Sequence, residues 1–228
     1  MQKLSLAPGP PGMEDAVRKI VAAELEGHVH KIEVDAMGNL IAVREGSRPV
    51  RVMLDAHMDE VALMVRNLRK DGFINFIPLG GVDPAVLLAQ RVVVHGGRGP
   101  VPGVIGAKPR HVMTEEELKK RPEIKSLYID VGATSDEELL SMGILPGSFV
   151  TFDAPFQARG DLVIGKAFDD RIGCLVLLEV LKSLPEDAPT VYAAFTVQEE
   201  QGLRGATVAA YRIDPEVAFA LEGTIAAD

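Results

Sequence analysis

Three apolar segments of this chain each end in side chains of the kind that bind metal ions. The segments and the residues that follow them are Val50–Leu54 with His57 and Asp59, Val191–Val197 with Glu199 and Glu200, and Val217–Leu221 with Glu222. Short apolar runs bounded by polar residues predict buried strands. Because the carboxyl ends of parallel strands meet at one edge of an open α/β sheet, these side chains are expected to converge. The pattern predicts an α/β fold with a polar site at a sheet edge.

The remaining α/β elements follow from hydrophobic spacing. Apolar residues at helical intervals predict helices at Met13–Leu25, Ile172–Leu184 and Gly202–Tyr211. Pro185 would stop the second of these. Alternating residues around a Gly-Asn turn predict a hairpin that spans residues 31–43.

A stretch of different composition and hydrophobic spacing interrupts this pattern. Between Asn67 and Phe156 the chain is dense in Gly and Pro, and it carries short β-like runs and only two brief helical signals, which start at Thr114 and Ser135. Short strands with frequent turns indicate a small β-barrel or sandwich. We therefore expect a body formed by residues 1–66 and 161–228, with an inserted β domain at 67–160.

Composition narrows the class of protein. A formal charge of −9 argues against a nucleic-acid binder, because phosphate contacts need clustered Lys and Arg. The single cysteine, Cys174, cannot form an internal disulfide. No apolar run approaches bilayer length, and the segment before Pro8 is too short for a signal peptide. A cytoplasmic protein without nucleic-acid or membrane partners is the expectation.

The polar residues at the strand ends suit a metal centre, and Asp169 with Asp170 adds a fourth point before a helix. Histidine and carboxylates without cysteine favour zinc, cobalt or manganese. Asp59, two residues beyond His57, is placed to hold the second imidazole nitrogen. One of two adjacent glutamates can bind metal while the other transfers a proton.

Each of these motifs has a simpler interpretation when it stands alone. His57 could be an ordinary polar residue at a strand end, and the Asp169-Asp170 pair could only cap a helix. Glu199 with Glu200 could be a solvated loop, and Glu222 a surface acid. The metal hypothesis rests on the four points together, each at the end or start of a predicted element.

Three stretches resemble the signatures of the M42 family of metallo-aminopeptidases: Ala56–Glu60, Lys166–Gly173 and Gln198–Ala206. Weaker similarities lie at Asp35–Leu40 and Gly106–His111. The resemblance implies a zinc-exopeptidase-like mixed sheet flanked by helices, with an inserted PDZ-like β-barrel that drives assembly into homo-oligomers, dodecamers in the family. It also implies peptide substrates that lose their N-terminal residue.

The resemblance further implies a role for each candidate residue. His57, Asp169 and Glu222 would bind one metal ion, and Asp169 would bridge to a second ion that Glu200 also holds. Two zinc or cobalt ions per subunit would be usual. Glu199 would be the general base and acid, and Asp59 the acid that orients His57. The family often has aspartate at the position of Glu222.

One departure from the family concerns the C-terminal side. Family members continue beyond Asp228 with a further histidine ligand, and none of the histidines other than His57 lies where that ligand should come. The chain is thus expected to be a truncated member with an incomplete second site and reduced activity. A deacylase, a glycan-acting hydrolase and a non-catalytic assembly fragment stay open as alternatives.

Overall fold

The computed structural model describes residues 1–224 and divides into two compact units. The first comprises Met1–Glu60 with Pro155–Asp228, and the second comprises Val61–Ala154. Each unit has its own hydrophobic core. The chain thus forms a body and an insertion, which are described in turn.

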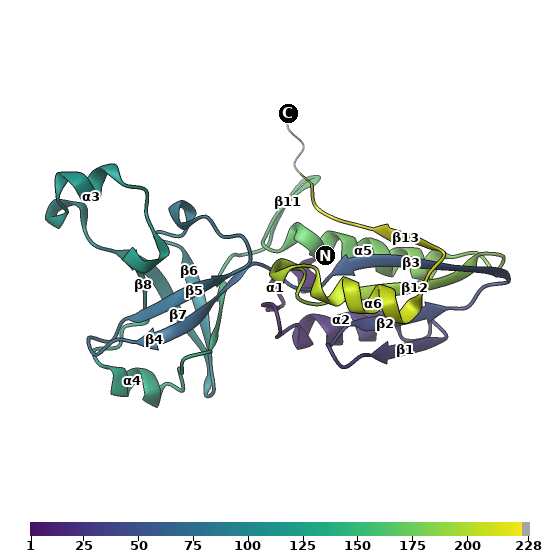
Figure 1. Ribbon diagram of the computed structural model, residues 1–228, viewed down its shortest axis with the longest axis horizontal. Coiled ribbons are helices and arrows are strands. Elements are labelled where there is room, and N and C mark those ends of the chain that lie inside the picture. The colour runs from purple at the N-terminus through teal and green to yellow at the C-terminus, as the bar shows by residue number, and fades with distance from the viewer. Residues whose placement is uncertain (225–228) are drawn as a thin grey trace. The chain divides into compact units, whose positions relative to one another are not determined.

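A five-stranded mixed sheet forms the centre of the body (Figure 1). Its strand order is β1 (Lys31–Val34), β2 (Leu40–Arg44), β12 (Pro189–Thr196), β3 (Arg48–His57) and β13 (Val217–Ala220). β3 runs parallel to both β12 and β13, whereas β2 is antiparallel to β1 and β12. The parallel trio brings the ends of all three predicted apolar strands to one edge of the sheet.

Helices cover both faces of this sheet, because successive apolar residues along a strand point to opposite faces and each face needs a partner. Phe195 and its same-face neighbours pack with α1 (Gln2–Leu6), α2 (Asp15–Leu25) and α5 (Phe168–Ser183). On the other face, Ala194 packs with residues of α6 (Arg204–Ile213). The predicted mixed α/β sheet flanked by helices is confirmed. A ribbon of two short strands, β10 (Gln157–Arg159) and β11 (Leu162–Ile164), completes the body, with the 3₁₀ helix η4 (Glu199–Gln201).

The insertion is a closed six-stranded barrel. In barrel order its strands are β4 (Ala62–Leu68), β5 (Ile74–Leu79), β8 (Leu127–Asp130), β7 (Gly99–Ala107), β6 (Arg91–Gly96) and β9 (Phe149–Phe152). Alternating residues such as Val92 and Val94 fill the interior. Its helical segments are α3 (Glu115–Lys119), α4 (Asp136–Ser141), η1 (Pro84–Val86), η2 (Arg110–Val112) and η3 (Ile124–Ser126). The prediction of an inserted small β-barrel is confirmed.

Within residues 1–224, no helix combines the length and apolar character that crossing a bilayer requires.

Candidate metal centre

His57 is the last residue of β3 and lies beside Thr196, the last residue of β12. The parallel register therefore places the loop that carries Glu199 and Glu200 next to the imidazole. Gln198 turns the chain there with a φ of 54°, in the left-handed region. Glu222 follows β13 by two residues, and β13 pairs with β3 on its other side. Sheet topology thus assembles three of the four predicted points around one histidine.

Carboxylates surround the Nε2 atom of His57, which is only 2% exposed. Asp169 Oδ1 lies 3.0 Å from Nε2, Glu222 Oε1 lies 3.7 Å away, and Glu199 Oε2 lies 3.9 Å away. The side chains of Asp169 and Glu222 are partly open to solvent, at 60% and 44% exposed. The centre is therefore a buried imidazole that faces a solvent-accessible group of acids.

Asp59 contacts both the imidazole of His57 and the loop that carries Glu199 and Glu200, which we call the glutamate loop. It is completely buried, and its Oδ1 lies 3.5 Å from Nδ1 of His57, a long contact. The same carboxylate accepts the backbone N–H of Glu199 at 3.0 Å and that of Glu200 at 3.1 Å. One carboxylate therefore holds the positions of both the histidine and the two acids.

The two adjacent aspartates before α5 point in different directions. Asp169 contacts His57, as described, whereas the carboxylate of Asp170 accepts the N–H of Gly173 at 3.0 Å in the manner of a helix cap. Its other oxygen accepts the backbone N–H of His57 at 3.2 Å. Burial raises the pKa of Asp170 to about 7. The simpler N-cap interpretation thus fits Asp170, whereas Asp169 is the aspartate whose carboxylate faces His57.

A buried ionic cluster supports this arrangement, although sequence reasoning assigned it no role. Lys166 Nζ donates to both oxygens of Glu60, at 2.7 and 2.6 Å, and the N–H of Gly9 donates to Oε1 at 3.0 Å. Arg171, fully buried, donates from Nε to the carbonyl of Met58 at 2.8 Å. Burial lowers the pKa of Lys166. The cluster joins the residues after His57 to those flanking Asp169. The sequence offered one sign of it, which is that its charged residues lie within the signature stretches.

Two further buried residues hold the loop after β12, and sequence reasoning missed both roles. Asn39 accepts the N–H of Val197 at 3.0 Å and donates to the carbonyl of Gly205 at 3.0 Å. Glu14 Oε1 accepts the N–H of Gln198 at 3.2 Å. The only available signal for Asn39 was its place in the weak Asp35–Leu40 similarity, and nothing in the sequence pointed to Glu14.

The carboxylates around His57 make this site favourable for positive charge. Burial alone would lower the pKa of His57, but the carboxylates of Asp59, Glu222 and Asp169 outweigh it and raise the pKa to about 10. The pKa of Glu222 is raised by burial and by its contact with Asp169. That of Glu200 is raised by burial and by the neighbouring acids. A cluster that pulls protons so strongly would be stabilised by a cation.

A divalent ion fits the donor set. One atom each from His57, Asp169 and Glu222 lies within 4.8 Å of the others, and this is the metal-type group found in the described part of the chain. One imidazole with two carboxylates suits zinc and related ions. Glu200 does not belong to this group.

Comparisons with known proteins agree with this geometry. A family model described as M42 glutamyl aminopeptidase matches residues 38–228. The lysyl aminopeptidase of Pyrococcus furiosus is 37% identical over 229 residues, which are 99% of this chain and 66% of the relative. The structure of aminopeptidase APDkam598 from Desulfurococcus kamchatkensis superposes with a TM-score of 0.93 at 44% identity, over 100% of this chain and 62% of that one.

A second similar structure carries information about assembly. The TET1 peptidase of Pyrococcus horikoshii, described as able to assemble into a tetrahedron or a large octahedral shell, superposes with a TM-score of 0.87 at 36% identity. That match covers 96% of this chain and 66% of the other. The chain spans 60% to 66% of the length of five curated relatives that it matches. With the family model matching most of its residues, the chain belongs to the M42 glutamyl aminopeptidase family.

Proposed function

We propose that this chain provides the metal centre of an aminopeptidase that removes N-terminal residues from peptides by hydrolysis. The observation that carries the proposal is the convergence of Asp169, Glu199 and Glu222 on Nε2 of His57. These residues come from four separate segments of the sequence. Family membership supports the assignment to peptides.

His57, Asp169 and Glu222 would hold one divalent ion, zinc or cobalt. Asp169 and Glu200 would contribute to a second, which we expect to bind more weakly because Glu200 lies outside the compact group. A bound ion would lower the pKa of a water molecule and polarise the scissile carbonyl. A metal titration should therefore give one tight site and one weak site, and two equally tight sites would contradict this expectation.

Glu199 is the proposed general base and acid. Its backbone is held by Asp59, and its carboxylate lies 3.9 Å from Nε2 of His57, close to the ligands but outside their group. From there it would take a proton from water and pass it to the leaving amine. A Glu199→Gln variant should lose turnover by at least about a hundredfold, since general acid–base catalysis contributes this much or more. Zinc affinity measured by calorimetry should change little; near-normal turnover would refute the role.

A substrate panel tests the reaction class. Aminoacyl anilides, N-acyl amino acids and soluble glucans would separate an aminopeptidase from a deacylase or a glycan-acting hydrolase. Cleavage of the anilides that disappears when metal is removed is the expected result. Metal binding without cleavage of any substrate would favour a non-catalytic assembly module.

Self-association is the proposed role of the barrel, and a dodecamer is the proposed assembly. A family member of 36% identity is described as forming closed shells, which supports this. We also propose a cytoplasmic location, consistent with a single buried cysteine. Sedimentation velocity should show particles of many subunits, and a monomer at all concentrations tested would contradict the assembly.

A further inference from the structure

A polar pocket lies at the opposite edge of the body's sheet from His57. Arg44 in its wall pairs with Val191 near the start of β12, whereas His57 pairs with Thr196 at the end of that strand. The cavity has a volume of 380 Å³ and is lined by Gly27, His28, Val29, His30, Arg44, Leu181 and Lys182. Every side chain in this set that can carry a charge is basic. This composition disfavours a metal ion and favours an anion.

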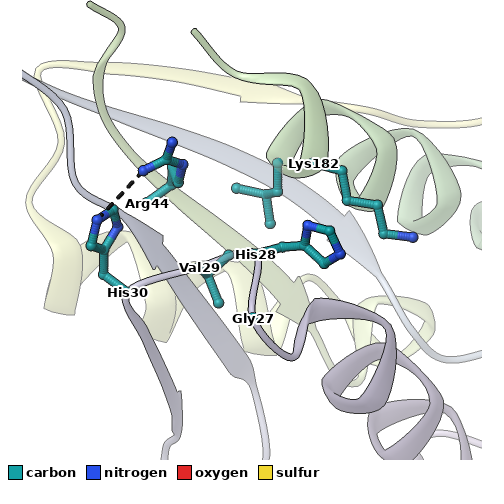
Figure 2. Close-up of a pocket in the computed structure, with 7 residues that line it drawn as sticks. Gly27, His28, Val29, His30, Arg44 and Lys182 are labelled. Atoms are coloured by element: carbon teal, nitrogen blue, oxygen red, sulfur yellow. Dashed lines mark hydrogen bonds between the residues drawn. The ribbon is translucent and has the colours of Figure 1, made fainter. Parts of the chain in front are cut away.

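The hydrogen bonds of His30 fix which ring nitrogen carries its proton. The backbone N–H of Glu45 lies 3.0 Å from Nδ1 of His30 and can only donate, so Nδ1 must accept. The proton of the neutral ring therefore resides on Nε2. Arg44 Nη1, which also can only donate, lies 3.4 Å from that same Nε2. Two donors thus face each other across the contact that Figure 2 draws as a dashed line.

Two facing donors cannot satisfy each other, whereas one acceptor placed between them would accept from both. Arg44 is only half-exposed, and within residues 1–224 no carboxylate forms an ion pair with it. Lys182, by contrast, contacts Glu24 at 3.2 Å and Glu179 at 3.5 Å. The Arg44 guanidinium is therefore the uncompensated charge of the pocket, and a partly buried charge without a partner is unfavourable.

We propose that this pocket binds a small oxyanion, a carboxylate or phosphate group, between Nη1 of Arg44 and Nε2–H of His30. A fork of one guanidinium and one imidazole donor matches the paired oxygens of such a group. His28 and Lys182 lie on the other side of the pocket, beyond Val29 (Figure 2). Val29 and Leu181 supply apolar surface for the carbon skeleton of an organic anion. The site is independent of the proposed peptidase activity.

Nuclear magnetic resonance of the imidazole nitrogens in the full chain tests the proposal, because only five histidines are present. Without added anion, His30 should show the tautomer with the proton on Nε2. Sodium phosphate and sodium acetate are then titrated separately, against sodium chloride at constant ionic strength. Saturable shifts of the His30 signals with either anion are expected, and the two arms distinguish a tetrahedral from a planar ligand.

Two variants distinguish anion binding by the Arg44–His30 pair from unspecific attraction to positive charge. Arg44→Gln should weaken anion binding by about tenfold or more, since it removes a charged hydrogen bond. Arg48→Gln removes the same charge from an exposed arginine that pairs with Asp187, and it should bind as the parent does. The proposal is overturned by a proton on Nδ1 of His30, by shifts that do not saturate with either anion, or by equal binding in Arg44→Gln and the parent.

Discussion

At the scale of single residues, Asp59 positions several parts of the candidate metal centre at once. It accepts the amides of Glu199 and Glu200 and contacts the far side of the His57 ring. In Asp59→Asn, an NH₂ group replaces one of the two carboxylate oxygens. It would then face a backbone N–H that also donates. We expect metal affinity to fall by about 10–100-fold, as is typical when a partner of a ligating histidine is lost. Calorimetric titration with zinc measures this.

A surface substitution of the same type provides the control for Asp59. Asp187→Asn removes an exposed carboxylate that forms a surface ion pair with Arg48. Its zinc affinity should equal that of the parent. Equal affinities in both variants would mean that Asp59 does not position the ligand.

Glu14 gives the chain a pH-dependent stability. Burial raises its pKa above the ordinary 4.5, although the N–H groups of Gly12 and Gln198 oppose the shift. The native state therefore binds this proton more tightly than the unfolded state does. By linkage, the free energy of unfolding falls as pH rises from about 4.5 through the native pKa, by at most about 1.4 kcal/mol per pH unit.

Glu14→Gln removes this titration and keeps an oxygen that can accept both N–H groups. We expect the variant to gain stability relative to the parent as pH rises toward 7, as measured by urea unfolding of the metal-free chain. Glu186→Gln, an exposed position, should follow the parent at every pH. A difference between Glu14→Gln and the parent that does not change with pH would contradict the linkage.

For the elements, close packing at the start of α6 determines where the glutamate loop lies. A Cβ added to Gly205 would come within 2.3 Å of the carbonyl of Val197 and 2.5 Å of the Asn39 side chain. Gly205→Ala must therefore push α6 away from the end of β12, at a cost of about 1–3 kcal/mol in the free energy of unfolding.

Denaturant midpoints of the body measure this cost. Ala210→Leu enlarges an exposed residue of the same helix and should stay within about 0.5 kcal/mol of the parent. A Gly205→Ala variant as stable as the parent would mean that the helix start can move freely.

The elements show why sequence reasoning succeeded at the sheet edge and stopped there. Apolar runs predicted the three strands, and a strand's end is where a parallel sheet gathers polar groups. The contacts of Asn39 and Glu14 were not predictable, because each joins segments more than 150 residues apart and leaves no local pattern. The split of roles between Asp169 and Asp170 likewise depends on the backbone before α5, where both residues leave helical geometry.

At the scale of the whole molecule, the metal-type group found among residues 1–224 lies in the body, while the barrel has a separate core. A ligand that binds only the native state stabilises it, by about 2.7 kcal/mol at a hundredfold excess over Kd. Zinc should therefore protect the body, and hydrogen exchange in peptides of β3, β12 and α5 should slow. Peptides of β6 and β7 should exchange at an unchanged rate, and a chelator should reverse the effect. Equal protection of both units would contradict this.

The extent of the insertion was the least predictable global feature. The Gly and Pro content and the short β-like runs suggested an inserted domain at 67–160, whereas the second compact unit is Val61–Ala154. The apolar residues of β4 continue directly from the polar residues after His57, so they read as part of the α/β body. They belong to the barrel because Leu63 and Val65 fill its interior, and only three-dimensional packing distinguishes the two cases.

The wide spacing of the ligands also determines the order of events during synthesis. Of these ligands His57 leaves the ribosome first, the whole barrel follows, and Asp169 and then Glu222 come after it. At about 5–20 residues per second, the first and last ligands are separated by on the order of ten seconds. The barrel, contiguous in sequence, can fold in that interval, while the body's sheet still lacks β12 and β13. A metal ion that needs all three ligands could therefore bind only after β13 and Glu222 have been made.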